Sequence, residues 1–314
     1  MNTELGTLRT VYRHEKNAIS EGLRTPAAST RSIRSVLQKL SRLTDKHLCA
    51  IRAASQLPAE VALVAVGGSG REQLFPASDV DVLLLLPGES TEAHNHLKPH
   101  LERFIGACWD AGLEIGSSVR TIAECVAEAK HDVTVQTAML EARLIEGDAA
   151  FFAHFQQQYR AGLNPKAFFT AKTLELRQRH TKHEGTPYSL EPNCKEPPGG
   201  LRDLHTILWA SQAAGLGRSW RELAASGIAT EFEATQLERN EATRSLSRAK
   251  LHAISGRHED RLIFDLQTAV AESLGIQSHT PVGETMPVRA SEVLMRRYYW
   301  AAKIVSQLNL ILMR

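Results

Sequence analysis

Two aspartates stand one residue apart at the start of an apolar run. Asp79 and Asp81 open the stretch "DVDVLLLL". In an extended strand, residues i and i+2 point to the same side, so we expect the two carboxylates to project together. Burying an unpaired carboxylate is costly, and two like charges this close must be neutralised by protons or by cations. The pair therefore predicts a cation site at the start of a strand.

A cluster of glycines precedes these aspartates. Gly67, Gly68 and Gly70 follow the apolar run "VALVAV". Backbone N–H groups in a glycine turn can cradle a phosphate. Carboxylate oxygens on one side and such a turn on the other suit Mg²⁺ that holds a nucleoside triphosphate. Two such ions can flank a phosphorus atom during in-line displacement, so we expect two Mg²⁺ ions during turnover.

The composition limits the classes of partner. The chain has 314 residues, of which 43% are hydrophobic and 23% charged, and its formal net charge is +2. These values are ordinary for a globular protein of one or two domains. So small a net charge indicates no general attraction to nucleic acid or to an anionic membrane. The first residues do not form a secretory signal, and the apolar runs are too short to span a membrane.

Cysteine and histidine spacing predicts neither disulfides nor a zinc site. The four cysteines lie far apart without a Cys-x-x-Cys pair, which is typical of a reduced, cytoplasmic protein. Two groups of histidines lack a standard zinc spacing and are expected to be solvated: His94, His96 and His100, and His180 with His183. In the dipeptide His131-Asp132, we expect Asp132 to cap a helix that begins at Val133.

The pattern of apolar residues predicts an α+β fold in three parts. Residues 1–60 have helical spacing, residues 61–147 predict a small α/β unit, and residues 148–314 are again helical. Within the middle part, strands are expected at residues 61–66 and 80–86 with a turn between them, followed by a helix at residues 91–111 and a third strand at residues 113–122. Four prolines and three glycines exclude a regular element from residues 183–200.

Several helices are expected after this loop. They are expected at residues 201–214, 230–255 and 260–274, and in a last segment with an apolar stripe that includes Leu294, Tyr298 and Val305. We expect Trp209 and Trp220 to belong to the core.

The chain resembles a superfamily of enzymes in one segment and a particular family in others. Val66-Gly67-Gly68, followed after residues 69–78 by Asp79-Val80-Asp81, resembles the DNA polymerase β-like nucleotidyltransferase superfamily. The resemblance implies that residues 61–147 are a nucleotidyltransferase domain. The segment "YSLEPNCKEPPGGLRDLHTILWAS" at residues 188–211 resembles the bacterial PII-protein uridylyltransferases, which add and remove UMP on the nitrogen-signalling protein PII. Further segments such as "LHAISGRHEDRLIFDLQ" occur in the same order. In that family phosphohydrolase and sensing domains follow, so this chain is expected to be the transferase part alone.

The resemblance implies roles for residues of the middle part. Asp79 and Asp81 would bind Mg²⁺, Gly67 and Gly68 would bind triphosphate through backbone N–H groups, and Ser69 could add its hydroxyl. The superfamily usually has a third carboxylate, a metal ligand or base, for which Glu114 is the candidate. Arg71 could contact phosphate or could anchor the turn by pairing with a carboxylate, and the sequence leaves both open.

The resemblance also implies roles for the proline-glycine loop. Asn193, Lys195 and Arg202 could bind the nucleotide. Alternatively, the loop only docks on the helical part, and Arg202 pairs with a carboxylate.

The leading functional hypothesis is transfer of UMP from UTP to a tyrosine of PII, with release of pyrophosphate. The residues themselves support metal-dependent nucleotidyl transfer, whereas uracil and PII come from the resemblance. Two alternatives stay open: transfer to another protein or small-molecule acceptor, and a nucleotide-binding regulatory module.

Overall fold

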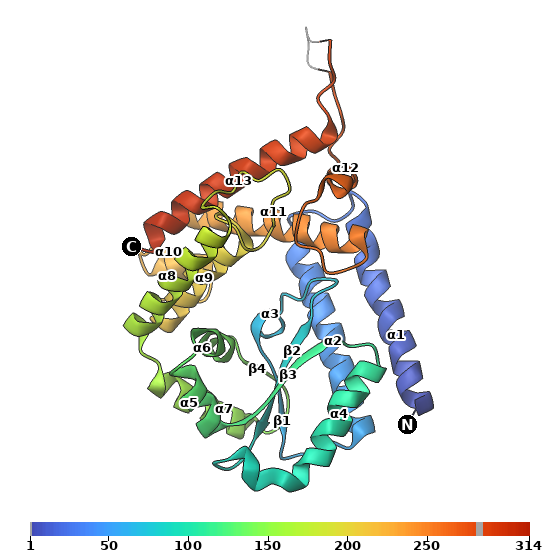
Figure 1. Ribbon diagram of the computed structural model, residues 1–314, viewed down its shortest axis with the longest axis vertical. Helices are drawn as coiled ribbons and strands as arrows, with labels where there is room; N and C mark the ends of the chain where they lie inside the picture. Colours follow the sequence, from blue (N-terminus) through green and yellow to red (C-terminus); the bar gives the residue numbers. More distant parts are fainter. Residues whose placement is uncertain (1, 281–284) are drawn as a thin grey trace. The chain divides into compact units, whose positions relative to one another are not determined.

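The computed structural model describes residues 2–280 and 285–314 and confirms the α+β class (Figure 1). Two compact units divide the chain. The first comprises the described residues up to Ile19 together with Val36–Leu74 and Ser78–Leu163, and the second comprises Ser20–Ser35, Phe75–Ala77 and the described part of Asn164–Arg314. No helix in the described ranges is long and apolar enough to cross a membrane.

The first unit consists of a small sheet and the helices on its two faces. Its strands are β1 (Ala62–Ala65), β2 (Val80–Leu86), β3 (Ile115–Thr121) and β4 (Arg143–Glu146). Its helical elements are α1 (Asn2–Glu21), α2 (Ile33–Ser55), α3 (Gly67–Gly70), η2 (Thr91–Leu97), α4 (Lys98–Asp110), α5 (Ile122–Ala129), α6 (Val133–Leu140) and α7 (Ala149–Gly162), of which α1 and α2 extend beyond the unit at one end.

The sheet has the strand order β3-β2-β1-β4. Strand β1 runs antiparallel to β2 and β4, whereas β2 and β3 are parallel, with Asp81 opposite Gly116. The three predicted strands are present. Strand β4 was not predicted, because its four residues are only partly buried and carry a charge at each end.

Helices cover both faces of the sheet (Figure 1). Along β2, Val82 and Leu84 pack in the cluster that includes α1, α2 and α4, whereas Leu83 and Leu85 pack in the cluster that includes α5, α6 and α7. Burial on both faces explains why β2 is a continuous apolar run rather than an alternating one. Asp81 shares the side of Leu83 and Leu85 but stands at the exposed start of the strand.

The second unit is helical. Its elements are η1 (Gly22–Arg24), α8 (Pro165–Lys182), α9 (Leu201–Ala213), α10 (Trp220–Ala225), α11 (Glu231–Ser255), α12 (Phe264–Ser273) and α13 (Ala290–Leu312). Helix α11 is the centre of this unit, because its last three turns are almost fully buried against α9, α12 and α13. Trp209 and Trp220 are buried, as predicted.

Some boundaries differ from the expectations. Helix α12 begins at Phe264 and not at residue 260, because the carboxylate of Asp260 is bound by side chains of α11. Asp132 caps α6 as predicted, since its carboxylate accepts the N–H groups of Thr134 and Val135. The compact units do not coincide with the expected domain limits at residues 60 and 147, and the division into domains stays a prediction.

Candidate active site

The two aspartates stand at the exposed start of β2. Asp79 directly precedes the strand and Asp81 is its second residue, and both are exposed. Glycines leave room for the Asp81 carboxylate: a Cβ atom at Gly116 would lie 2.8 Å from Oδ1, and one at Gly67 would lie 3.0 Å from Oδ2. Gly67 also has a φ of +58°, a backbone conformation that residues other than glycine rarely adopt. The Asp81 carboxylate therefore lies between two positions that only glycine fills without displacement.

The glycine turn is α3, a single helical turn that directly follows β1. A Cβ atom at Gly70 would lie 2.2 Å from the carbonyl oxygen of Glu141, so the chain passes α6 too closely for any other residue. The carbonyl of Ser69 accepts a hydrogen bond of 3.0 Å from Arg143, whose guanidinium binds both carboxylate oxygens of Asp45. Residues of α2, β4 and the end of α6 thus fix the turn.

The contacts of Arg71 correspond to one of its two predicted roles. Its Nη1 pairs with the carboxylate of Glu141, whose side chain is only 3% exposed, and its Nε donates to Gln73. In the structure Arg71 therefore anchors the turn. A phosphate contact by Arg71 stays a prediction.

The turn also offers donors. The first N–H groups of a helix have no carbonyl partner within it, and in α3 these belong to Gly67, Gly68 and Ser69. The hydroxyl oxygen of Ser69 is buried and has no hydrogen-bond partner among the described residues. Such a hydroxyl is costly unless something binds it. The hydroxyl can donate a hydrogen bond to an acceptor such as a phosphate oxygen.

The residues at the start of β2 fit a hard divalent cation. Two exposed carboxylates on one side of a strand provide the oxygen ligands that Mg²⁺ takes. Glu114 lies beside Asp79, because Val80 pairs with Ile115 and donates its N–H to the carbonyl of Glu114. The charge of Glu114 also acts on Lys16 in α1: burial lowers the pKa of Lys16, and Glu114 opposes part of that shift. The role of Glu114 as a third carboxylate stays a prediction.

The proline-glycine loop of the second unit is irregular, as predicted, and Asn193 organises it. The side-chain oxygen of Asn193 accepts the N–H groups of Lys195 (2.8 Å) and Glu196 (3.0 Å). Its backbone carbonyl accepts the hydroxyl of Tyr298 at 2.9 Å. The structure therefore shows Asn193 as a residue that shapes the loop, and nucleotide binding by its side chain stays a prediction.

Two glycines end the loop at the start of α9. A Cβ atom at Gly199 would lie 2.2 Å from the carbonyl oxygen of Ala302, and one at Gly200 would lie 2.4 Å from that of Lys195. Gly199 also has a φ of +75°. The pair lets the loop pass closely over α13 and over itself, which fixes the positions of Lys195 and Arg202.

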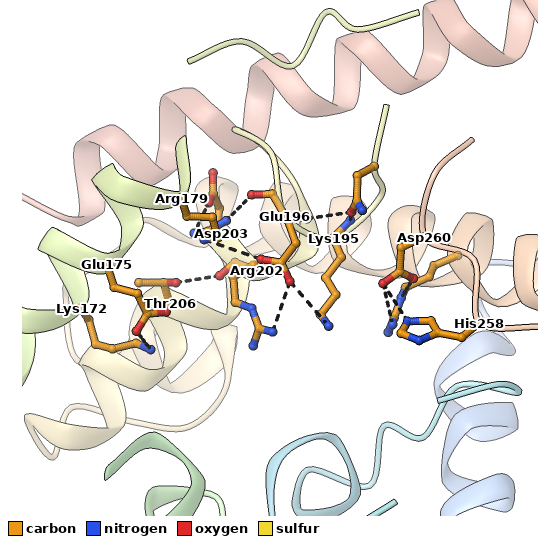
Figure 2. Close-up of polar contacts among 12 residues, drawn as sticks. Lys172, Glu175, Arg179, Lys195, Glu196, Arg202, Asp203, Thr206, His258 and Asp260 are labelled. Atoms are coloured by element: carbon orange, nitrogen blue, oxygen red, sulfur yellow. Dashed lines mark hydrogen bonds and ion pairs between the residues drawn. The ribbon is translucent and has the colours of Figure 1, made fainter. Parts of the chain in front are cut away.

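One carboxylate collects the cations of this loop (Figure 2). Glu196 Oε1 lies 3.5 Å from Lys195 Nζ and 3.3 Å from Arg202 Nη2, and Oε2 lies 3.9 Å from Arg179 Nε. Burial alone would raise the pKa of Glu196, but these three cations outweigh it and lower the pKa. Burial lowers the pKa of Lys195, and the charges of Arg202 and Arg248 lower it further. Arg179 also pairs with Asp203, so three cations face two carboxylates, and the remaining excess of positive charge suits a polyanion.

Behind this cluster lies a fully buried carboxylate that the sequence did not reveal. Asp203, in the first turn of α9, is bound by Arg179 Nη2 (2.8 Å), by His180 Nε2 (2.9 Å) and by the N–H of Gly199 (2.8 Å). The expectation that His180 is solvated is therefore wrong. The physical reason is that Asp203, twenty-three residues further along, needs donors because it has no access to water.

The ring of Trp209 packs in the core and also contacts two cationic side chains. Lys172 Nζ lies 4.5 Å from the centre of its ring, and the Arg202 guanidinium lies 5.4 Å from it. Lys172 also pairs with Glu175 at 2.8 Å (Figure 2). Cation–π contact fixes the Arg202 guanidinium from one side while Glu196 holds it from another.

A second cluster, missed at the sequence level, joins α11 to the segment before α12. Asp260 accepts both Nε (2.6 Å) and Nη2 (3.1 Å) of Arg248, and it lies 3.0 Å from His252 Nε2 and 3.2 Å from His258 Nε2. Burial would raise the pKa of Asp260, but hydrogen bonds from His252 and Arg248 hold it well below the usual range.

These two histidines and Asp260 are close enough together to suggest a metal site. However, the N–H of Ala77 donates to His252 Nδ1 at 3.3 Å, so Nε2 carries the proton and neither nitrogen has a lone pair to offer. Arg248 already binds both oxygens of Asp260. We therefore interpret the cluster as a hydrogen-bonded brace.

Comparison with known proteins agrees with this geometry. Residues 167–313 match the family model "GlnD PII-uridylyltransferase", and residues 15–119 match the model "Putative nucleotidyltransferase DUF294". The chain is similar to the "Bifunctional uridylyltransferase/uridylyl-removing enzyme" of Burkholderia orbicola, with 56% identity over 284 residues. Residues 167–313 thus form a domain of the PII-uridylyltransferase family. The match covers 90% of this chain and 32% of that relative.

A second relative extends the match. The protein of the same description from Burkholderia lata is 53% identical over 307 residues, which is 98% of this chain and 34% of the relative. The chain thus spans about a third of the length of the curated relatives it matches. The family match of the second unit includes Arg179, Glu196, Asp203, Arg248 and Asp260. Asp260 lies in the segment "GRHEDRLIFD", which resembles the family in sequence, and this resemblance could have pointed to Asp260 as a functional or structural residue.

Proposed function

We propose that this chain transfers UMP from UTP to a tyrosine hydroxyl of the PII signalling protein and releases pyrophosphate. The observation that carries the proposal is the Asp79–Asp81 pair beside a glycine turn, where only glycine at positions 67 and 116 leaves room for the Asp81 carboxylate. The PII-uridylyltransferase domain at residues 167–313 supports UTP and PII as the donor and the acceptor. The four cysteines carry free thiols, which agrees with a reaction in the cytoplasm.

In this proposal Asp79 and Asp81 hold Mg²⁺. When bound, the cation neutralises charge on the triphosphate and on the departing pyrophosphate. The backbone N–H groups of Gly67 and Gly68 and the buried hydroxyl of Ser69 donate hydrogen bonds to phosphate oxygens. Because Arg143 and Glu141 fix the turn, these donors need little reorganisation when the nucleotide binds.

The chemical step exchanges one phosphorus–oxygen bond for another. The tyrosine oxygen forms a bond to the α-phosphorus of UTP, and the bond between that phosphorus and the oxygen that leads to the β-phosphorus breaks. The phenolic proton leaves the acceptor, and Glu114 beside Asp79 is our candidate to accept it. The products are a uridylylated tyrosine and pyrophosphate.

Lys195 and Arg202 are proposed as nucleotide-binding residues, with Asn193 as the residue that shapes their loop. Their shared carboxylate, Glu196, balances only part of the local positive charge. An incoming phosphate group can therefore gain charge-assisted hydrogen bonds without first breaking a fully balanced ion pair.

Mass spectrometry of PII tests the proposal. Purified PII is incubated with the chain, Mg²⁺ and one nucleoside triphosphate at a time, and peptide mapping locates any modification. We expect UMP on a tyrosine with UTP, and none when this tyrosine is replaced by phenylalanine. Unmodified PII with all four nucleotides would refute the proposal, and efficient transfer from ATP, CTP or GTP would refute UTP as the donor.

Asp81→Asn and Asp110→Asn form a matched pair for this assay. Asp110 is an exposed aspartate at the end of α4, so its replacement makes the same chemical change away from the start of β2. We expect Asp81→Asn to abolish transfer and Asp110→Asn to leave it unchanged.

A further inference from the structure

A pocket of about 720 Å³ lies within the second unit, and its lining includes neither Lys195 nor Arg202. Helices α11 and α13 form two of its walls, and the segment around Pro26–Thr30 forms another. Its apolar lining includes Leu246, Leu294 and Ile304. This volume is in the range of pockets that enclose small organic molecules.

The charged groups of this pocket are all of one sign. Among the described residues, its lining includes Arg239, Arg244 and Arg297 but no aspartate or glutamate. Arg239 and Arg297 are exposed at the rim, whereas Arg244 is only 2% exposed. An apolar chamber with a buried cation and no carboxylate favours a ligand that is anionic at one end and apolar over the rest.

Arg244 is only partly satisfied by the protein. Its Nη2 donates to the carbonyl oxygen of Tyr298 at 3.3 Å, and its guanidinium stacks 4.5 Å from the centre of the Tyr298 ring. Its Nε and Nη1 are buried and have no hydrogen-bond partner among the described residues. A buried guanidinium with unused donors is costly, so an acceptor that enters the pocket would gain charge-assisted hydrogen bonds from Arg244.

The wall opposite α13 is fixed in place without a ligand. Lys250, fully buried in α11, donates from Nζ to the carbonyl oxygens of Leu23 (3.2 Å), Thr25 (2.7 Å) and Ser273 (2.7 Å). Arg24 Nε donates to the carbonyl of Ala253 at 3.1 Å. These contacts tie the segment before Pro26 to α11, so the pocket is largely preformed.

We propose that this pocket binds a small organic carboxylate with an apolar body, and that Arg244 accepts its carboxylate as the counter-ion. The apolar body lies against the leucine and isoleucine side chains of the lining. The site shares no side chain with the proposed transfer machinery. Its occupancy is therefore independent of whether the chain transfers UMP.

The 314-residue chain can be tested with two matched pairs of probes. Octanoate and 4-phenylbutyrate carry the carboxylate, and octanamide and 4-phenylbutyramide have the same apolar bodies without the charge. Binding is followed by isothermal titration and by intrinsic tryptophan fluorescence, to which Trp300, an exposed residue of the pocket lining, contributes. We expect at least one carboxylate to bind roughly tenfold or more tightly than its amide, the scale of a charge-assisted hydrogen bond. No binding by either carboxylate, or equal binding of each acid and its amide, would overturn the proposal.

Two variants locate the contact. Arg244→Met removes the charge at similar length, and Arg297→Gln removes a charge at the rim. We expect Arg244→Met to lose the preference for carboxylate, and Arg297→Gln to keep most of it. The melting temperature of ligand-free Arg244→Met should be unchanged or higher, because an apolar side chain replaces an unpaired buried charge. An intact preference in folded Arg244→Met, or a marked fall in its melting temperature, would show that Arg244 is a structural residue.

Discussion

The start of β2 and the proline-glycine loop are built in opposite ways. At the start of β2, two carboxylates are exposed on a strand that is otherwise buried, and glycines leave space around one of them. In the loop, Lys195 and Arg202 are half-buried and share one carboxylate, which also faces Arg179. The acidic residues are held by the backbone of a strand, whereas the cations are held by a shared carboxylate.

This difference determines how each region should respond to substitution. An exposed aspartate at the start of a strand contributes little to folding, so its loss should affect function and not stability. A buried charge in a network also contributes to stability where its removal leaves a partner unpaired. Substitutions of the two kinds can therefore show whether the contrast is real.

The largest effect is expected for the metal-binding residues. Asp79→Asn and Asp81→Asn should each lower the rate of UMP transfer at least about a hundredfold, because each removes an anionic ligand from the cation site. The melting temperature should be unchanged or higher, since one of two repelling charges is lost. Rates and thermal unfolding of both variants and of Asp110→Asn check this. More than about a tenth of the wild-type rate in either variant would contradict the proposed metal site.

The next largest effect is expected at the buried brace of the second unit. Asp260→Asn should lower the free energy of unfolding by about 3 kcal/mol at neutral pH, because Arg248 loses its buried counter-ion. Asp265→Asn is the control, since Asp265 is exposed in the first turn of α12 and should cost far less. Urea unfolding measures both. Equal effects of the two substitutions would contradict the brace.

The pH dependence sharpens this prediction. The folded-state pKa of Asp260 is depressed, so its stabilising contribution is fully present above the unfolded-state pKa of about 4 and is lost as the pH falls towards the folded value. The difference in unfolding free energy between wild type and Asp260→Asn should therefore shrink below about pH 4. Zn²⁺ should change neither protein, because both nitrogens of His252 are already in use.

The same contrast explains what could be predicted from the sequence. Asp79 and Asp81 stand two residues apart, so strand periodicity alone places them on one side, and the glycine turn lies next to them in the sequence. The bonds of Asp203 with His180 and of Asp260 with Arg248 join residues 23 and 12 positions apart, on separate elements. Local patterns do not encode such pairs, because they depend on how helices pack.

The secondary-structure elements that the sequence did not predict correctly were missed for the same reason. Strand β4 is recognisable only by its pairing with β1, since only two of its four residues, Leu144 and Ile145, are apolar and the other two are charged. The expected start of α12 at residue 260 followed local helical spacing. In the structure the tertiary contacts of Asp260 override that preference.

An intermediate effect is expected for the loop cation. Lys195→Ala should weaken UTP binding by roughly 1–3 kcal/mol, the scale of a charge-assisted contact. Its melting temperature should hardly change, because Lys195 shares Glu196 with two other cations that remain. Lys166→Ala removes an exposed lysine of α8 and serves as the control. Calorimetric titration with UTP and Mg²⁺ measures the affinity of each variant for UTP. Equal affinities of the two variants would mean that the loop only supports the fold.

The smallest effect is expected from a single methyl group. Gly116→Ala would place a Cβ atom 2.8 Å from Oδ1 of Asp81, so the carboxylate must move away from its position in the structure. We expect roughly a tenfold loss of transfer at low Mg²⁺, the cost of about 1.4 kcal/mol of cation affinity, with substantial recovery at high Mg²⁺. Stability should not fall, because position 116 is exposed in β3 and its φ is accessible to alanine.

Gly106→Ala is the matched control for this substitution. Gly106 is exposed in the interior of α4 and has nothing within 4 Å of a Cβ atom, so alanine should raise helix stability and leave the Mg²⁺ dependence unchanged. Transfer rates of both variants are measured across a Mg²⁺ titration. A loss in Gly116→Ala that high Mg²⁺ does not restore would place the defect in the fold of β3. Wild-type behaviour of Gly116→Ala would show that transfer tolerates a displaced Asp81 carboxylate. The rigid placement of the acidic residues would then not distinguish the start of β2 from the loop.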